Sequence, residues 1–178
     1  MTKLTKINFE KHELRIVDNE HVKIHHLTRP SSSQDNIKFI NCGGIMAVTG
    51  DYGNWIFCRE FIPKAGEHID PQYAAGKLKI ASEQNPYEMD SQATMEEIQE
   101  LMNSKEYEGK DFEYLKELLE KAEECGEPEY KEWAYDNCPS DMFEVIPYRQ
   151  DFKYWLKAVF DGFNEICERL KTVKYETE

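Results

Sequence analysis

The amino-acid sequence predicts an α+β fold, with an N-terminal antiparallel β-sheet meander followed by several helices. Short runs of alternating apolar and polar residues, separated by glycine-containing turns, fill positions 1–62. Helix-capping signals replace this pattern after Pro63, and apolar residues recur at three- and four-residue steps over 152–170. Strands that come first and helices that follow are typical of α+β proteins.

The N-terminal region contains five runs that read as β-strands, at positions 12–17, 20–27, 37–41, 45–49 and 54–62. Asp18-Asn19, Gly43-Gly44 and the segment 50–53 supply the turn residues between them. We therefore expect an antiparallel sheet of four to five strands paired in chain order. Both faces of the run 54–62 are largely apolar, which predicts a central strand covered on two sides.

The middle of the chain carries signals for four helices: N-capping residues, a proline at a first helical position and a glycine at a helix end. In chain order these helices are 72–81 after Asp70-Pro71, a segment opened by Ser91 or Thr94, a segment from Asp111 to Gly126, and 129–137.

The last helix, within 152–170, has the clearest pattern, because its apolar residues form one stripe over five turns. Such a stripe is wide enough to cover a face of a sheet. We expect this helix to back the N-terminal sheet and to bury Trp155, Val159, Phe163 and Ile166.

The 178 residues predict a single domain, since no long linker or internal repeat interrupts them. Its parts are a β-rich region at 1–62, a helical region at 63–144 and the C-terminal helix within 145–178. The net charge of −13 is unevenly distributed: positions 83–144 hold 20 acidic and 5 basic residues, whereas 1–82 have a net charge of +2. A concentrated negative field repels nucleic acid and attracts basic grooves.

The acidic segment therefore supplies a candidate partner-binding set, in which carboxylates would engage a basic channel: Glu117, Glu120, Glu123, Glu124 and Glu127. The alternative interpretation is a solvated helix face, because lysines alternate with these carboxylates.

The five cysteines form no CxxC pair, and residues 1–20 contain no signal-peptide core. Reduced thiols in a cytosol are expected, and no apolar run is long enough to cross a membrane. Motifs for nucleotide cofactors, metalloproteases and serine hydrolases are absent from the sequence, so no cofactor or metal is expected. Oligomeric state cannot be deduced from these patterns.

The pair His25-His26 is the first candidate catalytic feature. Alternation along a strand places His26 with Val22 and Ile24, and His25 in a polar row with Lys23. Two histidines and the nearby Arg29 could cleave RNA without a metal, as general base, general acid and stabiliser of the phosphorane charge. The alternative is one core histidine and one surface histidine.

A second cluster, around the run 54–62, adds Asp51, Arg59 and Glu60. Pairing of strands 20–27 and 54–62 would bring these side chains to the histidines. If the histidines take no part, a metal held by Asp51 and Glu60 is the next mechanism. The alternative is a tight turn at Asp51 and a structural ion pair.

The strings TGDYGNWIFCREF (49–61), IPYR (146–149) and DGFNEICERL (161–170) resemble a group of small acidic proteins encoded by bacterial phages and prophages. Some proteins of this kind are similar to inhibitors of CRISPR immunity, including type II inhibitors that act on the RNA-guided nuclease or truncate its guide RNA. The resemblance spans about residues 36–170. It implies a CRISPR nuclease or its guide RNA as partner and the cytoplasm of a bacterial host as location.

Three functions follow as hypotheses. The first is an anti-CRISPR ribonuclease that cleaves a guide RNA. The second is a non-enzymatic acidic protein that imitates nucleic acid and blocks a basic channel. The third is a structural or adaptor protein of phage origin.

Overall fold

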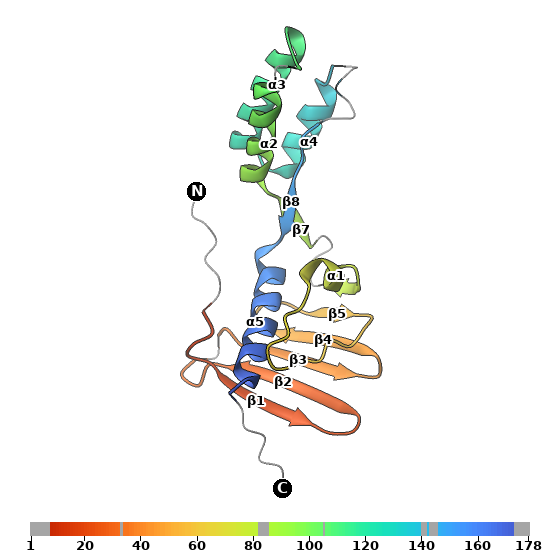
Figure 1. Ribbon diagram of the computed structural model, residues 1–178, viewed down its shortest axis with the longest axis vertical. Helices are drawn as coiled ribbons and strands as arrows, with labels where there is room; N and C mark the ends of the chain where they lie inside the picture. The colour runs from red at the N-terminus through yellow and green to blue at the C-terminus, as the bar shows by residue number, and fades with distance from the viewer. Residues whose placement is uncertain are drawn as a thin grey trace. The chain divides into compact units, whose positions relative to one another are not determined.

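The computed structural model describes residues 8–32, 34–81, 86–104, 106–139, 142 and 146–172. The chain forms two compact units (Figure 1). Met1–Pro86 and Lys153–Glu178 make up the first, which we call the sheet unit; Tyr87–Phe152 makes up the second, the helical unit. One domain was expected, because the sequence contains no linker at either boundary between the units.

The sheet unit contains a six-stranded antiparallel sheet with its strands in chain order, which confirms the predicted α+β class and the meander. The strands are β1 (Glu13–Asp18), β2 (Val22–Thr28), β3 (Ile37–Cys42), β4 (Ile45–Gly50), β5 (Trp55–Phe57) and β6 (Leu78–Ala81). The first four agree with the predicted runs to within two residues at each end.

The region from 54 to 81 differs from the sequence prediction. The predicted strand 54–62 is only the three residues of β5, and the predicted helix 72–81 divides into α1 (Pro71–Ala75) and strand β6. Ile56 of β5 pairs with Ile80 of β6, so tertiary pairing overrides the local helix signal. Strand β5 is therefore not a central strand covered on both faces; its Trp55 and Phe57 are buried on one face only.

Helix α5 (Tyr154–Leu170) covers one face of the sheet, as the apolar stripe predicts. The rings of Phe163 and Phe39 meet edge to face with centroids 5.7 Å apart. Gly162 permits this close approach, since a Cβ there would lie 3.3 Å from Ile37 Cγ2. Val159, Phe163 and Ile166 are buried as predicted.

Trp155 is the exception in α5, because 43% of its surface is exposed. It lies in the first turn of the helix, where its ring contacts Tyr52 at a centroid distance of 6.2 Å. The next residue, Leu156, is the one that is fully buried. The expectation of a buried Trp155 was therefore wrong.

The helical unit begins and ends with a two-stranded antiparallel ribbon of β7 (Tyr87–Met89) and β8 (Gln150–Phe152). Between these strands lie α2 (Ser91–Asn103), α3 (Lys110–Glu124) and α4 (Glu127–Asp136). The cap of α2 is Asp90, not Ser91 or Thr94, and Asp90 Oδ1 accepts a hydrogen bond from Ala93 N at 3.0 Å. The unit has its own core, formed by Ile98, Tyr114, Leu115, Leu118, Ala122, Tyr130, Ala134 and Met142.

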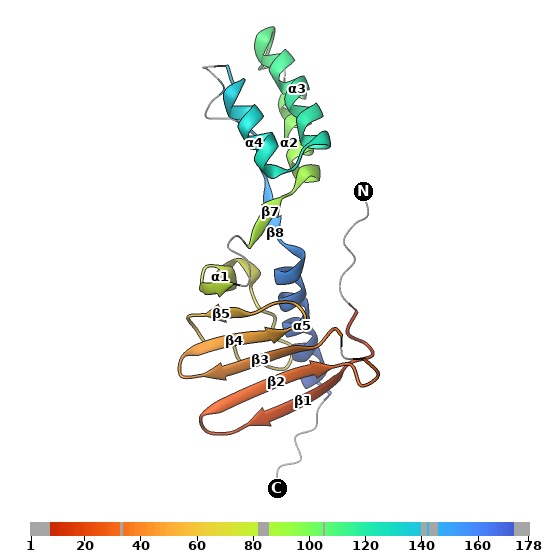
Figure 2. The same cartoon turned by 180° about the vertical axis from the view of Figure 1, so that it is seen from behind.

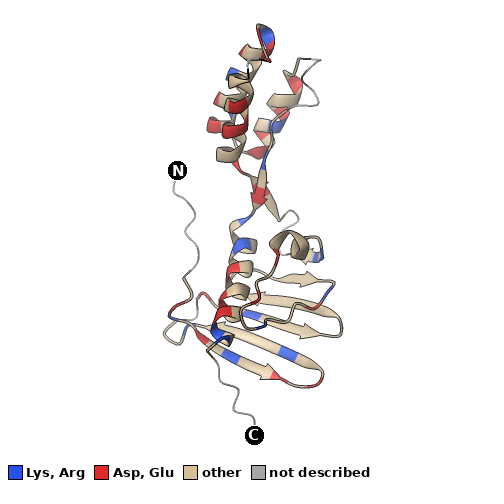
Figure 3. Cartoon of the chain, viewed as in Figure 1, with Lys and Arg blue, Asp and Glu red and all other residues tan. Residues whose placement is uncertain are grey.

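The division into units separates the charges of the sequence. The helical unit holds 20 acidic and 6 basic residues, a net charge of −14, and the remainder holds 15 and 16, a net charge of +1. Figure 3 shows acidic residues along α2, α3 and α4. Among the described residues, no helix has the length and apolar character needed to cross a bilayer.

Candidate functional site

The two adjacent histidines lie on opposite faces of β2, but in the reverse of the predicted assignment. His25 is buried on the face that α5 covers, opposite Phe39 of β3, and is only 5% exposed. Leu27, two residues along, is fully buried on the same face, and this apolar residue marks the core side. His26 is the partly exposed member of the pair. The prediction that placed His25 in the polar row was wrong.

His26 stands in a row of basic side chains, between Arg15 of β1 and Lys38 of β3. Its pKa is lowered from the usual value chiefly by burial and further by the positive charges of Lys38 and Arg15. Burial also lowers the pKa of His25, with Lys23 adding to that effect and Asp18 opposing it. Both histidines are therefore neutral at neutral pH, and they cannot face one substrate from the same side of the sheet.

Arg29 and Asp51 belong to a hydrogen-bonded cluster at one end of the sheet. Arg29 Nη1 lies 3.2 Å from Asp35 Oδ2, and Tyr52 OH donates to Asp35 Oδ1 at 3.1 Å. Asp51 Oδ2 accepts from Asn36 N at 2.7 Å. Asp35 has φ of 66°, a left-handed conformation that these bonds and the loop backbone hold in place. Asp51 thus closes a turn, in agreement with the structural alternative.

Arg59 and Glu60 lie beyond the end of β5, at the other end of the sheet. Arg59 Nη1 donates to Tyr73 OH, and its guanidinium carbon lies 5.4 Å from the centroid of the Tyr73 ring. Glu60 Oε1 accepts from Gly44 N, in the β3–β4 turn, at 3.1 Å. Each side chain therefore has a local structural partner.

The structure does not bring the six predicted catalytic residues together. Arg29 and Asp51 lie at the Gly50 end of β4, and Glu60 contacts the Gly44 turn before β4 begins. A six-residue strand is roughly 20 Å long, which is too far for one set of reacting atoms. The same distance separates Asp51 from Glu60. Among the described residues, no group of three or more His, Cys, Asp or Glu side chains could hold a metal ion.

Sequence reasoning missed Asp35 and Tyr52, which organise the cluster around Arg29. The signal for Asp35 was weak, because an aspartate in a Ser-rich loop is ordinary. The pKa of Tyr52 is raised, first by burial and then by the charge of Asp35, so its hydroxyl keeps its proton and acts as a hydrogen-bond donor. The cluster fixes a loop and shows no free nucleophile.

The acidic residues on the exposed face of α3 differ from the set of five partner-binding carboxylates that the sequence predicts. Glu113, Glu117, Glu120 and Glu124 recur at steps of four, three and four residues, so they share one exposed helix face. The buried Leu115, Leu118 and Ala122 lie on the other side. Glu123 is exposed beside this acidic stripe. Within the described residues, no ion pair is formed by Glu117, Glu120 or Glu123.

Glu127 stands apart from the other predicted partner-binding carboxylates. It is the first residue of α4, and its Oε1 lies 3.1 Å from Lys131 Nζ. Its pKa is lowered by a hydrogen bond from Tyr148 and by the interactions with Lys131. Glu127 therefore has internal partners and is less available than the carboxylates of α3.

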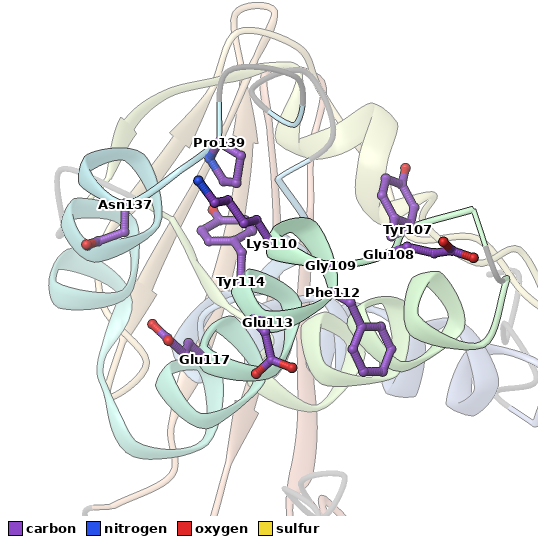
Figure 4. A pocket seen from close by; sticks show the side chains of 10 residues that line it. All are labelled: Tyr107, Glu108, Gly109, Lys110, Phe112, Glu113, Tyr114, Glu117, Asn137 and Pro139. Carbon is purple, nitrogen blue, oxygen red and sulfur yellow. The ribbon is translucent and has the colours of Figure 1, made fainter.

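A cavity of about 820 Å³ opens beside the start of α3 (Figure 4). It is lined by Tyr107, Glu108, Gly109, Lys110, Phe112, Glu113, Tyr114, Glu117, Asn137 and Pro139. Burial raises the pKa of Tyr114, whose hydroxyl donates to Ala134 O at 2.8 Å. Lys110 supplies one positive charge against three carboxylates in this lining. The cavity therefore extends the acidic surface and offers no catalytic pair.

Comparisons of this chain with protein-family models, with curated proteins and with solved structures give no match. The geometry defines an acidic three-helix unit joined to an antiparallel sheet backed by one helix. All five cysteines are free thiols.

Proposed function

We propose that the protein is a non-enzymatic inhibitor of a bacterial RNA-guided nuclease, and that its helical unit enters the basic channel that normally holds nucleic acid. The proposal places it in the cytoplasm of a host cell. The observation that carries the binding mode is the acidic stripe on α3 in a unit with a net charge of −14. The nuclease as target rests on the resemblance of the three sequence strings to phage proteins.

The spacing of the carboxylates in the stripe suits a partner surface that normally binds the phosphates of a nucleic acid. Successive carboxylates are three or four residues apart, which corresponds to about 4.5–6 Å along a helix. One nucleic-acid strand carries a charge about every 3.4 Å, so α3 offers a sparser row of the same sign. Glu96 and Glu100, exposed one turn apart on α2, add to it. Arginines of a phosphate-binding channel bind carboxylates in the same two-pronged geometry.

The guide-RNA ribonuclease is the second candidate, and the geometry favours it less. A metal-free mechanism needs an acid, a base and a cation around one phosphate. His25 and His26 face opposite sides of the sheet, and Arg59 and Glu60 lie at the end away from Arg29. In the described part of the sheet, His26 with Arg15 and Lys38 does present a histidine and cations on one accessible face.

Titration of the protein against a type II nuclease loaded with guide RNA tests the proposal. We expect target-DNA cleavage to stop near one protein per nuclease, with the guide RNA intact on a denaturing gel. Guide shortening at substoichiometric protein would establish the ribonuclease instead. Full cleavage of DNA at excess protein would refute both candidates for that nuclease.

A matched pair of variants tests the surface itself. Glu117→Gln, Glu120→Gln and Glu124→Gln together should weaken inhibition at least tenfold, because they remove three charges from the stripe. Glu10→Gln, Glu20→Gln and Glu67→Gln together remove three exposed charges from the sheet unit and should leave inhibition unchanged. An equal loss of inhibition in both variants would show that the net charge of the protein matters and the position of the stripe does not.

A further inference from the structure

The face of the sheet that α5 does not cover carries an uninterrupted apolar row. Each strand contributes one residue, and each residue is paired directly with the next across the sheet. In strand order, the row is Val17, Ile24, Ile40, Ala47, Ile56 and Ile80. An antiparallel sheet with one face in water normally alternates apolar and polar residues, so an apolar row on the second face calls for an explanation.

This face is open within the described part of the sheet unit. Phe39 and Ile37 point to α5, so their neighbour Ile40 points away from it. Figure 2 looks onto this side, and no helix lies in front of strands β1 to β4. Val17 and Ile80, at the two ends of the row, are 51% and 58% exposed. The four residues between them are half-buried, so the row is partly accessible along its length.

A row of basic side chains runs beside the apolar row. Arg15, His26 and Lys38 are paired across β1, β2 and β3, two residues along each strand from Val17, Ile24 and Ile40 and therefore on the same face. Glu13, two residues before Arg15 on β1, lies 3.8 Å from it.

On the other side of the apolar row, β2, β3 and β4 contribute the uncharged Val22, Cys42 and Ile45, and the Glu60 carboxylate contacts the β3–β4 turn just beyond them. The face as a whole is thus amphipathic, with an apolar centre and a cationic flank on one side only.

We propose that this face binds an amphipathic helix of a partner protein, with apolar residues on the row and carboxylates against Arg15 and Lys38. Six strands about 4.8 Å apart give a row about 24 Å long, which equals about 16 residues of helix. Helix α5, with 17 residues, packs across β2 and β3 on the opposite face. A helix on each face would complete a three-layer arrangement.

Charge complementarity favours this occupant over a second copy of the chain. A two-fold axis along the strands, through the middle of the sheet, would place each cationic row, which occupies β1 to β3, on the β4 to β6 half of the other copy. An axis along the apolar row would place each cationic row on the flank of Val22, Cys42 and Ile45 in the other copy. Both arrangements bury positive charge without a partner, which is costly. The inference concerns the sheet unit and is independent of the inhibition proposed for the helical unit.

Binding of two synthetic 18-residue helical peptides tests the proposal. Both carry one leucine stripe, and the residues along one side of that stripe are Glu in the first peptide and Lys in the second. Fluorescence anisotropy at low salt should show at least tenfold tighter binding of the Glu peptide to the full chain. Arg15→Glu with Lys38→Glu should reverse the preference, because these exposed or half-buried side chains leave the apolar row intact. Equal affinity for the two peptides, or no binding of either, would overturn the proposal.

A second variant tests the apolar row. Ile40→Asp should abolish binding of the Glu peptide, and circular dichroism should confirm that the variant is folded. Glu20→Gln, in the β1–β2 turn, is the matched control and should bind as the wild type does. Analytical ultracentrifugation of the wild type should show no self-association through this face. A dimer that Ile40→Asp dissociates would assign the row to a second copy and overturn the proposal.

Discussion

The two units of this protein differ in net charge and in the kind of side chains that form their cores. The sheet unit is nearly neutral and buries one sheet face under α5 with large side chains such as Trp55, Phe39 and Phe163. The helical unit has a net charge of −14 and buries a smaller set, in which Tyr114 and Tyr130 donate hydrogen bonds to the carbonyl oxygens of Ala134 and Pro147. Because the acidic residues are concentrated in the helical unit, the sheet unit is nearly neutral and presents an apolar surface.

The comparison also shows where each unit is open to partners. The helical unit exposes Glu117, Glu120 and Glu123, for which the described residues form no ion pair, and the sheet unit exposes an apolar row beside cations. The partner proposed for the first surface is basic, and the partner proposed for the second is apolar and acidic. The two proposals therefore concern different partners.

The largest expected effect is on the core of the sheet unit. Phe163→Ala should lower the free energy of unfolding of this unit by about 3–5 kcal/mol, because it removes a buried ring that contacts Phe39. Urea denaturation followed by near-UV signals measures the change. Trp155→Ala is the control from the same helix and should cost less, since Trp155 is partly exposed. Equal losses would contradict the assignment of the sheet-backing stripe.

The core of the helical unit provides the corresponding test. Leu115→Ala should cost about 2–5 kcal/mol, because Leu115 is fully buried in α3. If the units are energetically separate, helical signal should be lost at lower urea while the tryptophan signal of Trp55 keeps its midpoint. That measurement needs Trp133→Phe and Trp155→Phe in the background. A common midpoint for both signals would show that the units unfold together.

The buried histidine gives the sheet unit a pH dependence. Burial lowers the pKa of His25, so below pH 6.5 the unfolded chain binds a proton that the folded chain does not. Stability should be complete above pH 6.5 and fall as the pH drops through it, by at most about 1.4 kcal/mol per pH unit. His25→Leu should reduce this slope more than His26→Leu, because His26 is less buried. An unchanged slope in His25→Leu would contradict a neutral core histidine.

The smallest expected effect is in the acidic stripe of the helical unit. Glu120→Gln should raise its stability by about 0.5 kcal/mol at low salt, because Glu120 has three carboxylates but one lysine at the positions three and four residues away on α3. The gain should vanish at 1 M salt, where the screening length is about 3 Å. Thermal melts at two salt concentrations measure it. A gain that persists at high salt would point to packing rather than repulsion.

Local patterns predicted the elements well where one chain segment carries the whole signal. Turn residues at 18–19, 43–44 and 50–53 indicated the strands from 13 to 50, and the stripe in 154–170 indicated a helix with the observed buried face except at Trp155. The same reasoning failed for β6, because Ile80 becomes part of a strand only by pairing with Ile56. It also failed for His25, whose side of the sheet is set by Leu27 and by the helix above it.

The candidate site was predicted in part for the same reason. The sequence located the acidic residues of α3, since charge needs no partner to be counted. It could not show that Glu127 is held by Lys131 and Tyr148, or that Asp51 and Glu60 lie at opposite ends of β4.

The sequence by itself determined the α+β class, the order of most strands and helices, and the segment that carries the negative charge. These properties follow from the period of apolar residues, from turn chemistry and from composition, all of which are local. Only the tertiary structure decided that the chain forms two units, that β7 and β8 pair across 60 residues between Met89 and Gln150, and that six apolar side chains align on one open face. Register between distant strands determines these features, and no single segment of the sequence contains that register.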